Sequence, residues 1–281
     1  MPDESVDLVL TSPPYALHFK KAYGNVDKAE YVDWFRRFGE EIYRVLKPSG
    51  SFVLNIGGSY NAGSPTRSLY HFRLLLMLCE VVGFRLAQEC FWYNPAKLPA
   101  PAEWVNVRRV RVKDSVEYVF WLSKTDDPKA NNRNVLVEYS PDMLRLIRKG
   151  YRAKNRPSGY KITGKFQNHR GGAIPTNVVR ADIEFDGIPD NMLERGNNES
   201  NSAYIRRTAE VRQKAHPARF PAALPEFFIR LLTDEQDLVV DPFAGSNMTG
   251  AVAEGLSRRW IGFEILRDYA ENSQLRFESI L

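Results

Sequence analysis

The stretch Leu238-Val239-Val240-Asp241-Pro242-Phe243-Ala244-Gly245-Ser246-Asn247 decides the fold. Its apolar start predicts a buried strand, and the residues after it, Met248–Leu256, have helical spacing. Gly245 permits a close approach of the backbone, and the start of the helix offers free N–H groups. The next predicted strand, Trp260–Glu264, ends in a carboxylate. A carboxylate about twenty residues beyond such a loop is placed to hold ribose hydroxyls in nucleotide-binding folds.

The glycine content of this loop restricts the kind of ligand. The loop lacks the G-x-G-x-x-G pattern of dinucleotide-binding folds and the G-K-[ST] pattern of phosphate-binding loops. A loop with one glycine suits an adenosyl ligand that has no pyrophosphate. The alternative is an ordinary tight turn with a surface glutamate at position 264. The flanking strand and helix together with Glu264 favour the ligand site.

Strands and helices alternate outward from this loop. The predicted strands end near Pro13, Ile56, Tyr93, Ser123, Asp241 and Glu264. The predicted helices cover Asp27–Leu46, Thr66–Val82, Leu224–Thr233 and Met248–Leu256, and a last one begins at Arg267. This alternation predicts an α/β fold with a doubly wound sheet and helices on both faces. Residues 126–214 lose this periodicity and are too many for an ordinary loop, so they predict an inserted lobe between a first part, 1–125, and a last part, 215–281.

Composition excludes several classes of protein. The chain has 281 residues, with 39 Lys+Arg against 34 Asp+Glu and a net charge of +5, which is typical of a globular protein. No apolar run reaches the roughly 18 residues that a membrane span needs, and the acidic, polar start is unlike a secretory leader. The two cysteines, Cys79 and Cys90, cannot make a disulfide framework or a four-ligand zinc site. We therefore expect a cytoplasmic protein with no membrane span and no metal site.

Ser12-Pro13-Pro14-Tyr15, directly after the first predicted strand, indicates a chemistry. The exocyclic amine of a nucleobase is a poor nucleophile, because its lone pair is conjugated with the ring. Acceptors for its N–H groups make it more reactive, and the Ser12 hydroxyl and the Pro13 carbonyl can both accept. Two prolines stiffen the turn, and Tyr15 can stack on a base taken out of the duplex. The alternative is an ordinary Pro-Pro strand terminator, and the nucleoside-type site downstream favours the catalytic interpretation.

These two motifs, in this order, resemble the DNA amino-methyltransferases that use S-adenosyl-methionine, in their permuted "beta" arrangement. The sequence is most similar to the N4-cytosine methyltransferases of type II restriction-modification systems. Further stretches carry the resemblance: Lys20–Asn25, Leu46–Gly50, Trp92–Pro99 and His216–Pro221. It implies a Rossmann-like methyltransferase fold with a seven-stranded mixed sheet. It also implies a cofactor site formed by Asp241, Pro242, Phe243, Gly245, Ser246, Asn247 and Glu264, with His216, Pro217, Arg219 and Phe220 bordering the methionine end of the cofactor.

The resemblance also bears on the target base. In the family a serine at the first catalytic position favours cytosine, whereas Asp or Asn favours adenine, so Ser12 predicts N4-methylcytosine. An N6-adenine methyltransferase on the same fold stays an alternative, because both amines need the same acceptors. Relatives with Asn-Pro-Pro-Tyr modify protein glutamine, and Ser12 departs from that pattern. Methylation at cytosine C5 would need a Pro-Cys nucleophile, and neither cysteine follows a proline.

Basic residues indicate double-stranded DNA as the partner. Between Tyr151 and Arg170 the chain has six cations, no acid and three interleaved aromatic residues, which suits phosphate contacts. We predict DNA contacts for Arg152, Lys154, Arg156, Lys161, Lys165 and Arg170 and make residues 126–214 the target-recognition lobe. Lys20 and Lys21 could close over a flipped base, and Arg108, Arg109, Arg111 and Lys113 form another basic cluster. For the cations between Tyr151 and Arg170, and for Lys20 and Lys21, the alternative is a merely solvated set of charges.

One departure from the family concerns the number of strands. The sequence yields six, and the missing strand would lie at the sheet edge beside the strand that ends at Glu264. We expect either a shortened N-terminus or a cover for this edge from another element or a second protomer, with weakened cofactor binding. A catalytically weak or silent DNA-binding derivative is therefore a second alternative. A homodimer and a cognate restriction endonuclease are the further partners that we expect.

Overall fold

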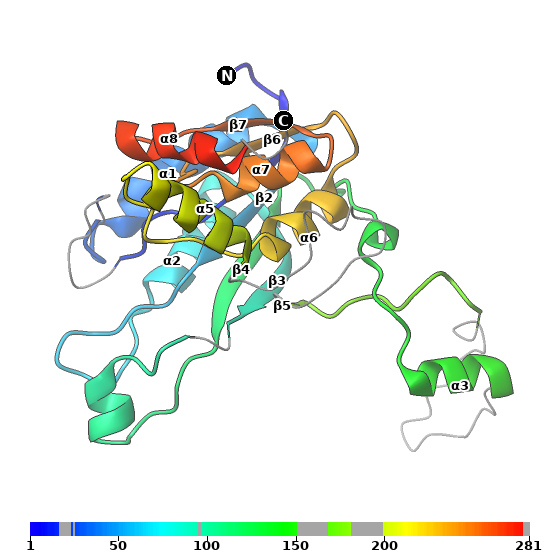
Figure 1. Ribbon diagram of the computed structural model, residues 1–281, viewed down its shortest axis with the longest axis horizontal. Helices are drawn as coiled ribbons and strands as arrows, with labels where there is room; N and C mark the ends of the chain where they lie inside the picture. Colours follow the sequence, from blue (N-terminus) through cyan, green and yellow to red (C-terminus); the bar gives the residue numbers. More distant parts are fainter. Residues whose placement is uncertain (17–23, 25, 95–96, 151–167, 181–198, 278–281) are drawn as a thin grey trace.

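The protein forms a twisted seven-stranded sheet. The computed structural model describes residues 1–16, 24, 26–94, 97–150, 168–180 and 199–277. The strands are β1 (Val6–Thr11), β2 (Leu46–Ile56), β3 (Arg85–Tyr93), β4 (Val116–Ser123), β5 (Val178–Arg180), β6 (Leu238–Asp241) and β7 (Arg259–Gly262), in the spatial order β5-β3-β4-β2-β1-β6-β7 (Figure 1). Only β4 runs antiparallel to its neighbours β2 and β3. The predicted mixed α/β sheet is confirmed.

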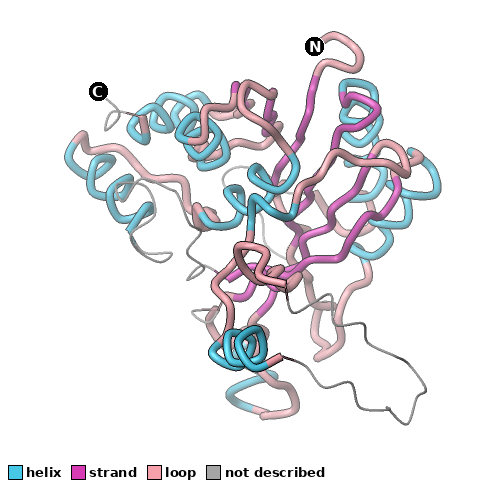
Figure 2. The backbone as a smooth tube through the Cα atoms, turned by 90° about the vertical axis from the view of Figure 1, so that its right-hand side faces the viewer, coloured by secondary structure: helices cyan, strands magenta, loops and turns pink. Residues whose placement is uncertain are grey.

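Helices cover both faces of the sheet, as the alternating sequence predicts (Figure 2). One face carries α1 (Tyr31–Val45) and α2 (Tyr70–Leu76), which continues as a π-helical turn over Met77–Val82. The other face carries α6 (Ala223–Leu232) and α7 (Met248–Gly255). The last helix is α8 (Arg267–Ser273), extended by a 3₁₀ turn over Gln274–Arg276.

Alternating side chains of the central strands build two cores. In β1, Leu8 and Leu10 join the core under α6 and α7, whereas Val9 joins the core under α1. In β2, Val53 faces the first of these cores, and Phe52 and Leu54 face the second. All of these side chains are buried, so β1 and β2 are held from both faces, which gives the loops that follow them a rigid base.

The seventh strand is not the one that the sequence leaves missing. It is β5, which pairs with β3 at the opposite edge of the sheet and comes from the segment 126–214. The expectation of six strands is therefore wrong, because three residues are too few to show an alternating pattern. At the other edge, none of the described residues forms a strand beyond β7.

The segment 126–214 is not uniform. A 3₁₀ turn, Asn132–Val135, packs against α6, and β5 joins the sheet. The short helix α3 (Pro141–Lys149) has no buried residue and lies apart from the sheet (Figure 1). The helix α5 (Glu199–Glu210) returns to the core and contacts the 3₁₀ turn after α8. The segment thus combines a projecting part with elements that complete the main body.

Strand direction gathers the loops of interest at one edge of the sheet. The strands β1, β2, β3, β6 and β7 run parallel, so their carboxyl ends lie along one edge of the sheet. This carboxyl edge runs across the strands and is distinct from the two outer strands, β5 and β7. The predicted catalytic turn follows β1, and the predicted cofactor loop follows β6. Since β4 runs the other way, the connection from β3 to β4, which contains a π-helical turn at Glu103–Val107, starts and ends at this edge as well. Ligands of such sheets bind at this edge.

No helix of the described residues is long and apolar enough to cross a membrane.

Candidate active site

Asp241 fixes the shape of the predicted cofactor loop from inside. Its carboxylate is buried and accepts three hydrogen bonds, from Thr11 Oγ1 at 2.6 Å, from Thr249 Oγ1 at 2.7 Å and from the Phe243 N–H at 3.0 Å. Burial raises its pKa to about 6. These bonds tie the end of β1, the loop and the start of α7 together. The Asp241 side chain therefore shapes the loop, and its carboxylate is directed at these three donors.

The turn of the loop depends on two residues with left-handed backbone. Gly245 has a φ of 53°, and Asn247 has a φ of 56° while its side chain caps α7 by accepting from the Gly250 N–H at 3.1 Å. Ser246 is held from outside, because the Arg276 guanidinium donates to its carbonyl at 2.5 Å and to its hydroxyl at 2.7 Å. The ring of Tyr204, from α5, lies 4.3 Å from that guanidinium. The shape of the loop is thus supported by contacts within the protein.

Glu264 lies opposite the glycine of this loop. Its two carboxylate oxygens accept from the Gly245 N–H at 3.0 Å and from the Leu266 N–H at 2.8 Å. Each carboxylate oxygen can accept a further hydrogen bond, so these contacts leave room for the hydroxyls of a ribose. The sequence prediction that Gly245 and Glu264 belong to one site agrees with this contact.

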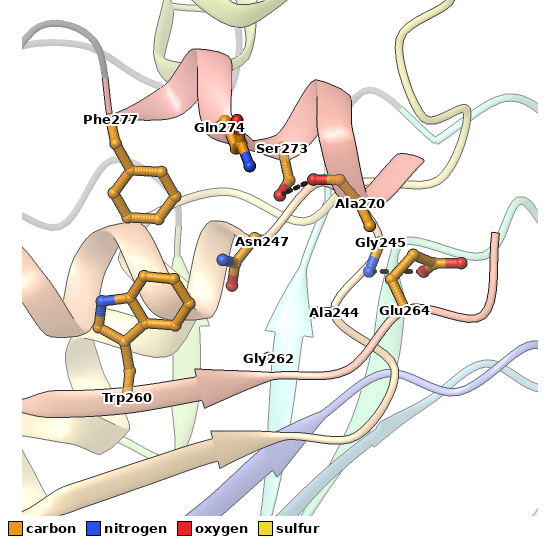
Figure 3. A pocket seen from close by; sticks show the side chains of 10 residues that line it. All are labelled: Ala244, Gly245, Asn247, Trp260, Gly262, Glu264, Ala270, Ser273, Gln274 and Phe277. Carbon is orange, nitrogen blue, oxygen red and sulfur yellow. Dashed lines mark hydrogen bonds between the residues drawn. The ribbon is translucent and has the colours of Figure 1, made fainter. Parts of the chain in front are cut away.

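A cavity of about 370 Å³ opens beside this pair (Figure 3). Figure 3 shows Gly262 and Trp260 on β7 below it and the residues of α8 and its 3₁₀ turn above it. Its lining consists of Ala244, Gly245, Asn247, Trp260, Gly262, Glu264, Ala270, Ser273, Gln274 and Phe277. Three predicted cofactor residues, Gly245, Asn247 and Glu264, therefore share one hollow. Its size lies in the range of small-molecule sites.

The other predicted cofactor residues surround the loop from two sides. His216 is buried beneath Gly245, where a Cβ on the glycine would lie 3.2 Å from the imidazole, and burial lowers the pKa of this histidine. Arg219 donates to the His216 carbonyl, Phe220 packs against the core under α6, and Pro217 is exposed. On the other side Phe243 packs on α1, with its ring centroid 4.9 Å from that of Phe38. The half-buried Pro242 lies between Asp241 and Phe243.

The predicted catalytic turn lies next to this loop because β1 and β6 are neighbours. The bond from Thr11 to Asp241 joins the last residue of β1 to the last residue of β6. Ser12 follows at once, so its position is set by the cofactor loop. Tyr31 donates to the Pro14 carbonyl at 2.8 Å, while no described residue donates to the Pro13 carbonyl. Within the described part of the chain, the two proline carbonyls therefore differ, because that of Pro14 has a donor in Tyr31.

A hydrogen-bonded cluster surrounds the Ser12 hydroxyl. Ser12 Oγ donates to Asn55 Oδ1 at 3.1 Å and lies 3.2 Å from the Tyr15 hydroxyl. The Tyr15 hydroxyl lies 3.1 Å from Asn55 Oδ1 and 2.7 Å from Glu117 Oε2, and Lys97 Nζ lies 3.0 Å from Glu117 Oε1. Burial, followed by the Glu117 charge, raises the pKa of Tyr15 well above its usual value, so this side chain stays neutral. The ring lies against Gly57, where a Cβ would come within 2.4 Å of it.

Three residues of this cluster were not predicted from the sequence: Asn55, Glu117 and Lys97. Asn55 and Glu117 are buried, and each interrupts an apolar part of its strand, Phe52–Ile56 in β2 and Val116–Leu122 in β4. A buried polar residue near the end of a strand at the ligand edge needs a partner, and this signal could have found both. Lys97 belongs to the stretch Trp92–Pro99, to which the resemblance gave no role.

Most of the predicted DNA-contacting residues lie outside the described residues: Lys20, Lys21, Arg152, Lys154, Arg156, Lys161 and Lys165. Arg170 is described and exposed, and its N–H donates to the Tyr139 hydroxyl at 2.9 Å. In the connection from β3 to β4, Arg108 and Arg109 are exposed, and Arg108 lies over the Trp104 ring at 4.9 Å. Arg111 is instead bound within the protein, to Asp114 and to the Pro65 carbonyl. Arg108 and Arg109 therefore lie on a connection that begins at the same edge as Ser12.

The fold, with an acceptor turn and a one-glycine loop on adjacent strands, defines a Rossmann-like methyltransferase. The chain matches the family model described as DNA methylase (N6_N4_Mtase) over residues 6–275 and belongs to this family. It is similar to the type II methyltransferase M.PvuII of Proteus hauseri, with 50% identity over 98% of this chain and 79% of that protein.

Two solved structures extend the comparison. One is that of the PvuII DNA methyltransferase, described as cytosine-N4-specific, with a TM-score of 0.75, 44% identity and coverage of 98% of this chain and 80% of the other. The other is TTHA0409 of Thermus thermophilus, in complex with S-adenosyl-L-methionine, with a TM-score of 0.55 and 20% identity over 99% of this chain and 88% of the other. The second supports the fold alone.

Gly245→Ala is expected to weaken binding of S-adenosyl-methionine at least tenfold in calorimetric titration. The new Cβ would be strained at a φ of 53° and would lie 3.2 Å from the His216 ring, which shifts the loop. Gly63→Ala is the matched control, since Gly63 has a φ of 62° but open space around it. In both variants the free energy of unfolding should fall by about 1 kcal/mol, because alanine is strained at a positive φ. Equal cofactor affinity in the two variants would show that the contact with His216 has no role in binding.

Proposed function

We propose that the protein transfers a methyl group from S-adenosyl-methionine to the N4 amine of cytosine in double-stranded DNA. The observation that carries this proposal is the direct bond from Thr11 to Asp241, which places the acceptor turn and the cofactor loop side by side. Gly245 and Glu264 would hold the adenosyl part, and the cavity beside them is of suitable size. The cofactor, when bound, supplies an electrophilic methyl group on its sulfonium.

The residues of the turn prepare the amine for attack. Ser12 Oγ accepts one N–H of the amine and the Pro13 carbonyl accepts the other, which makes the nitrogen lone pair more available. The amine nitrogen would take the methyl group from the sulfonium, whose sulfur would keep the electron pair of the broken C–S bond as a neutral thioether. The nitrogen would then release one proton to solvent. No covalent bond to the protein is needed, so positioning and acceptor geometry supply the catalysis.

Cytosine is preferred to adenine as the target for two reasons. Ser12 stands at the first position of the catalytic turn, and the similar PvuII enzyme is described as cytosine-N4-specific. An N6-adenine methyltransferase is the second candidate, because the same two acceptors would serve that amine. A weak or silent DNA-binding derivative is the third.

DNA binding would use surfaces on both sides of the sheet edge at which the carboxyl ends of the parallel strands lie. We assign target recognition to the segment 126–214, where Arg170 and the α3 residues Arg145 and Arg148 are exposed. Residues 1–125 and 215–281 would then form the two halves of the catalytic domain. The exposed Arg108 and Arg109 suit phosphate contacts beside the target base. Action on DNA favours a cytoplasmic location, and the similarity to a type II methyltransferase favours a cognate endonuclease. Since none of the described residues adds a strand beside β7, that edge favours a homodimer.

Incubation with unmethylated duplex DNA and methyl-labelled S-adenosyl-methionine tests the proposal. We expect label in the DNA and, after digestion, in N4-methyldeoxycytidine. Label in N6-methyldeoxyadenosine would support the second candidate instead. DNA that is bound but never labelled would contradict transfer altogether and favour a silent module.

A further inference from the structure

We propose that Glu117 is a positioning residue, which acts through Tyr15 to keep the Ser12 oxygen free to accept from the substrate amine. This inference rests on the proposed function. It adds a buried carboxylate on β4, outside both sequence motifs, to the catalytic apparatus. It also gives a role to Lys97, which holds that carboxylate.

The Tyr15 hydroxyl has a single proton to donate. Three acceptors lie within reach: Glu117 Oε2 at 2.7 Å, Asn55 Oδ1 at 3.1 Å and Ser12 Oγ at 3.2 Å. The carboxylate is the nearest of the three and the charged one among them, and charge-assisted hydrogen bonds are the stronger ones. The proton therefore goes to Glu117.

The Ser12 hydroxyl likewise has one proton, which it donates to Asn55. Asn55 Nδ2 donates to the Tyr118 carbonyl at 3.1 Å, which orients the amide so that its Oδ1 faces the catalytic turn. Because Tyr15 donates elsewhere, this oxygen is available to Ser12 Oγ at 3.1 Å. Ser12 then donates to Asn55, and its lone pairs remain for the amine that is to be methylated.

The Glu117 carboxylate is itself held by an ion pair with Lys97. Glu117 is 9% exposed, and Lys97 Nζ lies 3.0 Å from its other oxygen. This ion pair offsets part of the cost of burying the carboxylate. Without the charge, the Tyr15 proton can turn to Ser12 or to Asn55. Donation to Ser12 would occupy a lone pair that the amine needs, and donation to Asn55 would compete with Ser12 for the same amide oxygen.

Glu117→Gln keeps the volume of the side chain and removes its charge. We expect kcat for DNA methylation to fall roughly tenfold to a hundredfold, in line with the loss of one hydrogen bond to a charged group. The KM for S-adenosyl-methionine should stay within twofold. Glu89→Gln is the matched control, since Glu89 is an exposed glutamate on the neighbouring strand β3, and it should leave kcat unchanged.

The deciding measurement repeats Glu117→Gln in a Tyr15→Phe background. Because Glu117 acts through the Tyr15 hydroxyl, kcat should not fall further there. A fall of the same factor in both backgrounds would show an independent structural role and overturn the inference, as would an unchanged kcat in the single variant. An inactive wild-type protein would overturn the proposed function as well.

Lys97→Met changes the surroundings of the same carboxylate from its other side. It tests the role of Glu117 if Glu117→Gln does not fold. It leaves the Tyr15 contact in place and removes the partner of the other Glu117 oxygen. We expect kcat to fall several-fold in the wild-type background and not at all with Tyr15→Phe. Equal falls in the two backgrounds, or none in either, contradict the inference.

Discussion

Ser12→Ala is expected to slow methyl transfer strongly while S-adenosyl-methionine still binds with an affinity within about twofold of that of the wild type. The substitution removes the hydroxyl that accepts from the amine and leaves Thr11, which contacts the cofactor loop through Asp241, in place. Removing one such acceptor should lower kcat by roughly a hundredfold to a thousandfold. Single-turnover transfer to DNA and calorimetric titration of the cofactor measure the two effects separately.

Ser51→Ala is the matched control for this experiment. Ser51 is a buried serine on β2, and its hydroxyl accepts from Trp121 Nε1 at 3.0 Å. Its replacement should cost about 1 kcal/mol of stability and leave kcat unchanged. If Ser12→Ala also lost cofactor binding, or kept its kcat, the turn after β1 would not be the catalytic one.

Asp241→Ala should have the larger effect on the cofactor site, with no S-adenosyl-methionine binding detected in calorimetric titration. The change leaves two hydroxyls and one N–H without their acceptor in a buried place. We expect a loss of about 3 kcal/mol in the free energy of unfolding, since each buried group without a partner is costly. The loop that carries Gly245 would then lose its attachment to β1. Urea unfolding measures the stability.

Asp7 gives a control of the same kind at the far end of the same strand pair. Its buried carboxylate accepts from Lys47 Nζ at 2.7 Å and from the Leu238 N–H at 2.9 Å, which ties the start of β1 to the start of β6. Asp7→Ala should destabilise the protein by a comparable amount and leave cofactor affinity nearly intact. Ordinary binding by Asp241→Ala would show that the loop does not depend on this carboxylate.

The sequence was a good guide where an element packs against the core. The strands Val116–Ser123 and Leu238–Asp241 end at the residues near which the sequence predicts an end. Both are apolar runs with clear ends, so hydrophobic periodicity alone defines them. The three residues of β5 have no such pattern, and pairing with β3 makes them a strand. Such pairing depends on the rest of the fold.

The candidate site could be predicted in its two loops and not in its supporting contacts. Ser12 and Gly245 belong to local motifs, whose chemistry can be inferred from residue type and spacing. The partners of Tyr15 come from β2 and β4, 40 and 102 residues away along the chain. The inner role of Asp241 depends likewise on Thr11, 230 residues distant. Contacts between distant residues become visible only when the sheet order is known.

The chemical identity of the methylated nucleoside tests the central claim most directly. Duplex DNA whose cytosines carry ¹⁵N in the exocyclic amine would be treated with the wild-type protein and S-adenosyl-methionine, digested and analysed by tandem mass spectrometry. We predict one methylated deoxycytidine whose methyl group remains with the ¹⁵N on fragmentation, and its formation at a rate about a hundredfold to a thousandfold lower with Ser12→Ala. A methylated deoxyadenosine, or a methyl group on a ring carbon of cytosine, would contradict the account.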